Sequence, residues 1–138
     1  ALIEAATYLD CSHVDVLGAY PESVTEAFVN CLEASGFSVD AVVALDCADG
    51  SASFNIDVVA EVSRFTSNYP ENSHPLILPD TAINTLDLLN DLEHRAGRPV
   101  ITANQATVWS GLRLLGLDTE FVGGGSLFSD PTSGSDLQ

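Results

Sequence analysis

The chain has 138 residues, 46% of them hydrophobic, which suits one domain with a buried core, and no apolar run is long enough for a membrane span. Its 20 acidic residues face four arginines and no lysine, and a net charge of −16 excludes nucleic acid as a natural partner, since binding it requires cationic groups for the phosphates. An ordinary acidic protein would explain this charge but not the missing lysine, so we expect a cytoplasmic protein of a halophilic archaeon, where salt screens the self-repulsion.

The first strand and helix are predicted over 14–36. The apolar run 14–20 is typical of a strand, and apolar residues at helical spacing follow it. Ser23 and Glu26 are spaced as a capping box for this helix. Cys31 is expected on its apolar stripe, as a small buried side chain.

Two further units follow. The β-branched run 39–46 predicts a central strand covered on both faces, and a helix is expected around 56–63. Residues 76–78 predict the third strand. The third helix is expected over 83–96 and ends before Gly97.

The last unit comprises a strand over 99–103 and a helix over 105–115, which ends at Gly116. Residues 121–124 predict a short final strand. Residues 129–138 are expected to form a flexible polar tail after a single domain over 1–128.

These alternations predict an α/β fold: a parallel sheet of four to five strands with helices on both faces. Ligands of such sheets bind beyond the carboxyl ends of the strands. Seven residues are predicted there: Tyr20, Asp46, Cys47, Asp80, Thr81, Thr102 and Asn104.

Other potential sites in the sequence are weak. The three cysteines show no CxxC spacing and the three histidines no metal-ligand spacing, so we expect neither a disulfide framework nor a metal site. The "GGGS" at 123–126 lacks the lysine and the helix of a phosphate loop, and is interpreted as a flexible turn.

Asp80 follows the third strand, and Thr81 comes next. If a helix begins there, its free N–H groups stabilise a carboxylate or an anionic ligand. Either residue could instead be only the N-cap, so a capping role and a chemical role both remain open.

Thr102, Asn104 and Gln105 follow the fourth strand. Their hydroxyl and amide groups could hold a substrate carboxylate, although Asn104 could also cap the helix. Trp109 is expected in the core.

The segment "PVITANQATVWSGLRLLG" resembles the last strand and helix of the maleate cis-trans isomerase and arylmalonate decarboxylase branch of the aspartate/glutamate racemase superfamily. "LGAYPESV", "TLDLLNDLEHRAGRPV" and "GGGSLF" are also similar to that branch. The resemblance covers about 14–128. It implies one half of a fold with two pseudo-symmetric α/β halves and an active site between them.

The resemblance also implies roles for individual residues. Tyr20 matches a tyrosine that binds a substrate carboxylate, and Asn55 matches an asparagine that lines the pocket. Asp80 falls on the position of the second catalytic cysteine, with Thr81 as a neighbour whose N–H helps to hold the substrate. Residues 102–105 fall on the segment that closes the site.

Two departures limit the chemistry. The half with the first catalytic cysteine, or its replacement, is absent, and the second cysteine is an aspartate here. A carboxylate is too weak a nucleophile for a covalent adduct, but it can serve as a general base beside a carboxylate.

Two hypotheses follow. The first is an isomerase-, racemase- or decarboxylase-like enzyme for a small carboxylic or dicarboxylic acid, with Asp80 as base and Tyr20 as anchor, without cofactor or metal. It implies a homodimer, because a second copy would replace the missing half. The second is a carboxylate-binding or structural module without chemistry, a relic or fragment. The chain could also be an excerpt of a longer one.

Overall fold

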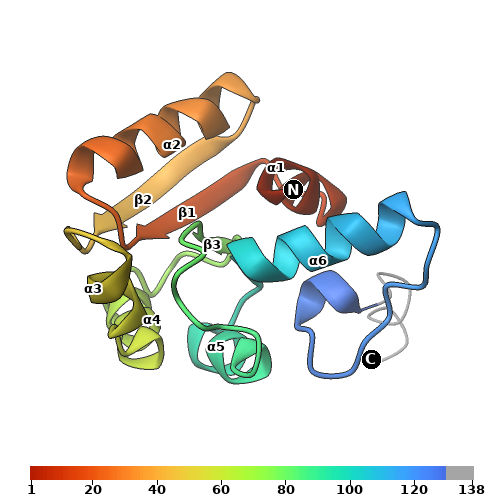
Figure 1. Ribbon diagram of the computed structural model, residues 1–138. Coiled ribbons are helices and arrows are strands. Elements are labelled where there is room, and N and C mark those ends of the chain that lie inside the picture. Colours follow the sequence, from red (N-terminus) through yellow and green to blue (C-terminus); the bar gives the residue numbers. More distant parts are fainter. Residues whose placement is uncertain (130–138) are drawn as a thin grey trace.

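The computed structural model describes residues 1–129, so the predicted tail lies outside the described residues apart from Ser129. The chain forms a sheet of four parallel strands in the order β2-β1-β3-β4 (Figure 1). The strands are β1 (His13–Gly18), β2 (Ser38–Ala44), β3 (Leu76–Leu78) and β4 (Val100–Thr102). The predicted parallel α/β fold is therefore confirmed.

The helices lie on both faces of the sheet, as predicted (Figure 1). They are α1 (Leu2–Tyr8), α2 (Glu22–Ala34), α3 (Gly50–Phe54), α4 (Val58–Asn68), α5 (Leu89–Ala96), α6 (Ala103–Leu114) and the short 3-10 helix η1 (Ser126–Phe128). Within the described part of the chain, no helix is long and apolar enough to cross a membrane.

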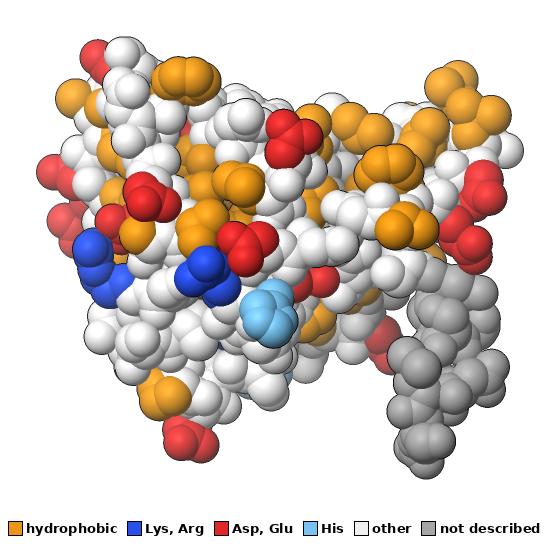
Figure 2. Space-filling model, turned by 90° about the horizontal axis from the view of Figure 1, so that it is seen from below, with side chains coloured by type: hydrophobic (Ala, Val, Ile, Leu, Met, Phe, Trp, Pro, Cys, Tyr) orange, Lys and Arg blue, Asp and Glu red, His pale blue; other side chains and the backbone are white. Residues whose placement is uncertain are grey.

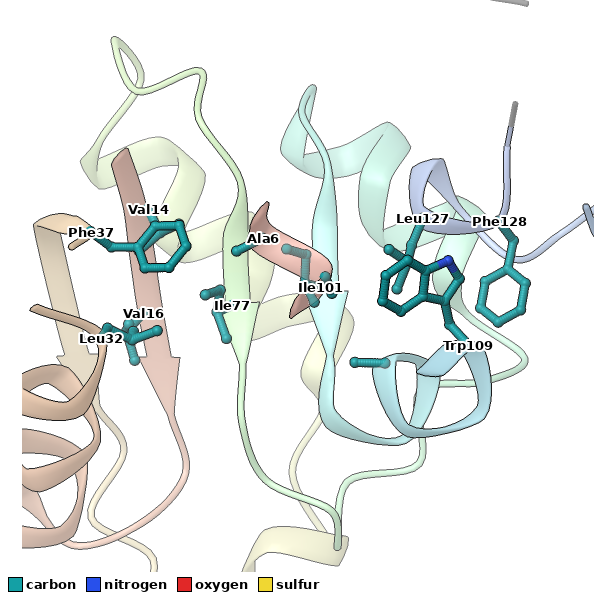
Figure 3. Close-up of a cluster of buried hydrophobic side chains, with 12 residues drawn as sticks. Ala6, Val14, Val16, Leu32, Phe37, Ile77, Ile101, Trp109, Leu127 and Phe128 are labelled. Atoms are coloured by element: carbon teal, nitrogen blue, oxygen red, sulfur yellow. The ribbon is translucent and has the colours of Figure 1, made fainter. Parts of the chain in front are cut away.

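Two hydrophobic clusters sandwich the sheet. On one face α1, α2 and α6 cover Val14, Val16, Ile77 and Ile101, and Trp109 is buried in this cluster as expected (Figure 3). On the other face α4 and α5 cover side chains that point the opposite way from the same strands. This alternation explains why the central strands are apolar on both parities.

The beginning of the chain differs from the prediction in three ways. Helix α1 was not predicted. The capping box in α2 is wrong, because the N-cap is Pro21 without a side-chain bond and Ser23 lies inside the first turn. Cys31 is exposed, since the buried side of α2 runs through Thr25 and Leu32 at helical spacing, and position 31 lies off it.

The third helix begins at Leu89 rather than at residue 83. Residues 81–88 instead form turns that side chains and backbone hold in place. The Thr85 hydroxyl donates to Thr102 Oγ1 at 3.0 Å, and Ile83 is buried in the core. The spacing of apolar residues over 83–88 therefore predicted a helix, but the contact of Thr85 with Thr102 at the end of β4 holds this segment as turns.

No fifth strand forms at 121–124. The segment is tied down by side chains instead: Gln105 Nε2 donates to Gly124 O at 2.7 Å, and Glu93 accepts from the backbone N–H of Ser126 at 2.9 Å. A Cβ on Gly124 would lie 2.5 Å from Phe128 Cβ. The "GGGS" segment is a turn, as interpreted, but it is tightly packed.

Candidate functional site at the carboxyl edge of the sheet

Tyr20 and Asp80 lie close together at the carboxyl ends of the neighbouring strands β1 and β3. The half-buried Tyr20 donates its phenol proton to the carbonyl oxygen of Pro79 at 3.1 Å, directly before Asp80. The pairing of β1 with β3 brings these residues together although 59 positions separate the two bonded residues in sequence.

The Asp80 side chain is 5% exposed, and its Oδ1 accepts from the Ala82 N–H at 2.7 Å. Because α5 begins only at Leu89, Asp80 caps a turn and does not lie at a helix N-terminus. The predicted helix-dipole stabilisation of this carboxylate is therefore wrong.

The phenol of Tyr20 keeps its proton at neutral pH. Burial raises its pKa, and the negative charge of Asp80 raises it further, while a hydrogen bond with the backbone of Thr81 acts in the opposite direction. The phenol is thus a hydrogen-bond donor within electrostatic reach of the carboxylate.

Asn104 joins this group from the start of α6. It is half-buried, and its Nδ2 donates to the carbonyl oxygen of the exposed Thr81 at 3.1 Å. The structure therefore gathers four of the predicted residues in a chain of contacts: Tyr20, Asp80, Thr81 and Asn104.

Thr102 and Gln105 are buried, and their side chains are engaged within the protein. Thr102 caps α6, and Gln105 Oε1 accepts from the Thr102 N–H at 3.0 Å in a true capping box. Gln105 also holds Gly124, as described above. The side-chain oxygen and nitrogen atoms of both residues are therefore hydrogen-bonded within the described part of the protein. The N-cap of α6 is Thr102 rather than Asn104.

Asn55 stands apart from the other predicted residues. It is exposed at the end of α3, where its Nδ2 donates to Ser51 O at 2.8 Å. Among the described residues, no hydrogen bond links it to Tyr20 or Asp80.

The hydrogen bond that holds the backbone of Tyr20 was not predicted. Thr25 Oγ1 donates to the carbonyl oxygen of Tyr20 at 3.4 Å. The same hydroxyl lies 2.6 Å from where a Cβ on Gly18 would be. The "G-x-Y" at the end of the predicted strand over 14–20 was the available signal, because only glycine leaves room for this contact.

A charged cluster at the opposite, amino end of the sheet was also not predicted. Asp15 is fully buried in β1 and accepts hydrogen bonds from Arg98 Nη1 and His74 Nε2, both at 2.7 Å. Asn72 Nδ2 and the Ala41 N–H donate to it at 2.9 Å. An aspartate within an apolar strand was the signal for such a buried cluster.

The arginines contribute no cation to the candidate site. Arg64, Arg95 and Arg98 pair with Glu61, Asp91 and Asp15, and Arg113 stacks over Tyr8 and Trp109. Acidic side chains are spread over the face in Figure 2, whereas basic ones lie on one side of it. Around Tyr20, a ligand would thus meet neutral donors and the carboxylate of Asp80.

Within residues 1–129, no group of three His, Cys, Asp or Glu side chains could hold a metal ion. Two surface hollows, of about 530 and 710 Å³, lie between α1 and α6 and beside the loop after α6. Neither is lined by Tyr20 or Asp80, so neither belongs to the candidate site.

Residues 1–128 match the family model for arylmalonate decarboxylase, Amdase. The chain belongs to this family. It is 26% identical over 131 residues to the maleate isomerase of Pseudomonas putida, which covers 94% of this chain and 52% of that protein. The chain thus spans about half the length of this Amdase relative.

Solved structures of relatives show the same fold. The maleate isomerase Iso(C200A) from Pseudomonas putida S16 with maleate has a TM-score of 0.84 at 26% identity, covering 94% of this chain and 52% of that one. The Nocardia farcinica maleate cis-trans isomerase bound to TRIS has a TM-score of 0.86 at 27% identity, covering 96% and 54%. The predicted resemblance to one half of these proteins is confirmed.

Proposed function

We propose that this Amdase-family chain forms half of an isomerase-, racemase- or decarboxylase-like enzyme that transfers a proton beside the carboxylate of a small carboxylic or dicarboxylic acid. The observation that carries the proposal is the nearly buried carboxylate of Asp80 beside the protonated phenol of Tyr20. Family membership and the maleate isomerase relatives support the same substrate class. No step of this chemistry requires a cofactor.

Each residue at the edge has a part in this proposal. Asp80 is the general base, because a carboxylate can remove a proton but is a poor nucleophile for a covalent adduct. Tyr20 donates a hydrogen bond to a substrate carboxylate, for which its phenol turns away from the carbonyl oxygen of Pro79. Thr81 and Asn104 supply further donors, and Asn55 is the predicted pocket residue from α3.

The buried Thr102 and Gln105 act indirectly in this proposal. They cap α6 and hold its first turn, which carries Asn104. We therefore assign them the task of positioning the substrate-binding segment, in place of the direct contacts that the sequence suggested.

A second half must complete the site at this edge, and we propose that a second copy supplies it. The charged groups along this edge are acidic: Glu22, Asp46, Asp49, Asp80 and Asp87. Two such edges repel each other in dilute buffer, so this homodimer needs strong salt screening. The cytoplasm of a halophile, as expected from the composition, would provide it.

The test compares Asp80→Asn with Asp87→Asn, an exposed acid in the loop before α5. A 2-arylpropionate, which carries one hydrogen on the carbon beside its carboxylate, is incubated with the protein in D2O at high salt, and NMR follows the exchange of that hydrogen for deuterium. We expect Asp80→Asn to abolish turnover and to leave ligand-induced shifts in place, whereas Asp87→Asn keeps both. Turnover that survives Asp80→Asn contradicts the assignment of the base.

The alternative function is a carboxylate-binding module without chemistry. The chain spans about half the length of the maleate isomerase relative, and this missing half favours a module without chemistry. Ligand-induced shifts without deuterium incorporation by the unmodified protein, in low and in high salt, would establish this alternative.

A further inference from the structure

Three leucines project from the end of α6, on the side of the molecule away from the candidate site. Leu114, Leu115 and Leu117 are 85%, 74% and 55% exposed; Leu114 lines the hollow described below, and we call Leu115 and Leu117 the leucine knob. The knob is fixed in place: Gly116 has a φ of +68°, and the Leu117 N–H donates to Leu112 O at 2.9 Å. Exposed apolar side chains in so acidic a chain call for a partner surface.

A hollow of about 530 Å³ lies directly beside the knob, between α1 and α6, and we call it the α1–α6 hollow. Figure 1 shows these helices side by side. Its lining is mostly apolar and aromatic, from Ile3, Tyr8, Trp109 and Leu114. Cavities of about 150 Å³ already accept a benzene ring, so this hollow has room for two leucine side chains.

The charges around this surface are of both signs. Arg113 stacks over Trp109 at 4.6 Å and over Tyr8 at 5.0 Å, and within residues 1–129 it forms no ion pair, unlike the other arginines. Exposed Asp118 and Glu120 follow the knob. Glu4 also lines the hollow, so one cation and three anions flank the same surface.

We infer that the leucine knob of one copy packs into the α1–α6 hollow of a second copy, around a two-fold axis. An isologous contact requires that one surface carries both the projecting and the receiving part, and this surface carries both. It also requires both charges, so that Arg113 of each copy can pair with Asp118 or Glu120 of the other. To bind an unrelated partner, the surface would need only a projecting or a receiving part, and charges of only one sign.

This contact is separate from the carboxyl edge and does not depend on the proposed chemistry. Helix α6 begins at the carboxyl end of β4 and ends, with the knob, toward the opposite edge of the sheet. A chain that uses both surfaces would assemble as a dimer of dimers, as in tetramers with two isologous contacts. Because the contact is mainly apolar and each copy carries a net charge of −16, salt should strengthen it.

The experiment is sedimentation velocity over a range of protein concentrations in about 1 M KCl, where the Debye length falls to about 3 Å. Phe54→Asp serves as the background: Phe54 is a 68% exposed apolar residue of α3, the helix after β2, and we expect a charge there to weaken the other proposed contact. We expect the Phe54→Asp protein to remain a dimer. Adding Leu115→Asp or Leu117→Asp should weaken that dimer by about tenfold or more.

A charge swap tests the orientation. In the Phe54→Asp background, and at about 0.15 M KCl where the Debye length is about 8 Å, Arg113→Glu should weaken the dimer, and combining it with Glu120→Arg or Asp118→Arg should restore it. Far-ultraviolet circular dichroism verifies that each variant is folded. A Phe54→Asp protein that is monomeric at all concentrations overturns the inference, and so does a dimer that Leu115→Asp and Leu117→Asp leave unchanged.

Discussion

Removal of the buried Asp15 carboxylate should destabilise the fold more than any change at the exposed edge. Asp15 joins all four strands at the amino end of the sheet: it lies on β1, bonds to Ala41 on β2, and receives His74 and Arg98 from the segments that lead into β3 and β4. Arg98 Nε and Nη2 are also buried, without partners among the described residues. Asp15→Ala would leave this guanidinium without its carboxylate.

The magnitude follows from the burial of both partners, which are 0% and 5% exposed. Breaking a buried ion pair by removing one partner costs about 3–5 kcal/mol, a large part of the stability of a domain this size. Urea unfolding followed by circular dichroism measures the change. The control is Asp40→Ala in the same cluster, whose 40% exposed side chain pairs with His13 and should contribute about 1 kcal/mol or less.

A loss below about 1 kcal/mol for Asp15→Ala would refute the reasoning. Replacement of both partners, as in Asp15→Leu with Arg98→Met, should recover much of the loss, because no buried charge then remains unpaired. If the double variant does not recover stability, the loss in Asp15→Ala comes from altered packing rather than from the unpaired guanidinium of Arg98.

The same carboxylate predicts the pH dependence. Burial opposes its ionisation and is the largest single effect, but hydrogen bonds from His74, Arg98 and Asn72 together outweigh it, so the pKa of Asp15 lies below its ordinary value. A depressed pKa in the folded state contributes stability that is present above the unfolded-state pKa, near 3.8, and is lost as the pH falls through the folded value. Urea midpoints of Asp15→Ala should therefore fall less steeply below that pH than those of the unmodified protein.

Three further changes can be measured. Gly18→Ala should cost about 1–3 kcal/mol in urea unfolding because its Cβ would lie 2.6 Å from the Thr25 hydroxyl, and Thr25→Ala in the same chain should relieve part of that cost. The pKa of Tyr20, from ultraviolet absorbance with Tyr20→Phe to assign the signal, should lie above the ordinary value of about 10 and fall toward it in Asp80→Asn; an unchanged value would contradict their proximity. Glu93→Ala should speed hydrogen exchange of the loop that carries η1 by removing charge-assisted hydrogen bonds, whereas an unchanged rate would mean that packing alone holds the loop.

The sheet could be predicted because its information is local. Each strand is a short apolar run followed by a turn and a helix, and this alternation permits few topologies other than a parallel sheet. Tyr20 and Asp80 were placed at one edge for the same reason, since both directly follow strands. Their contact depends on β1 lying next to β3, and no local sequence pattern predicts this strand order.

Errors arose where distant groups decide local structure. The stretch after Asp80 has helical apolar spacing, yet Thr85 bonds to Thr102 and Ile83 enters the core, so turns persist up to α5. Similarly, Gln105 appeared free to bind a substrate because its partner, Gly124, comes 19 positions later in the chain. Side chains in strand-end motifs can therefore be assigned to a site only when their internal partners are known.

The corrected boundary of α5 changes the argument for Asp80 as a base. The sequence-based reason was a helix dipole, but such a dipole acts within the first turn of a helix, and α5 begins at Leu89. The structure supplies a different reason. Tyr20 retains its proton, since burial and the charge of Asp80 raise its pKa; the phenol donates it to the carbonyl oxygen of Pro79, next to the Asp80 carboxylate, which accepts from the Ala82 N–H. In the proposed reaction, a substrate that takes the place of the Pro79 carbonyl would have its hydrogen-bond donor on one side and its proton acceptor on the other.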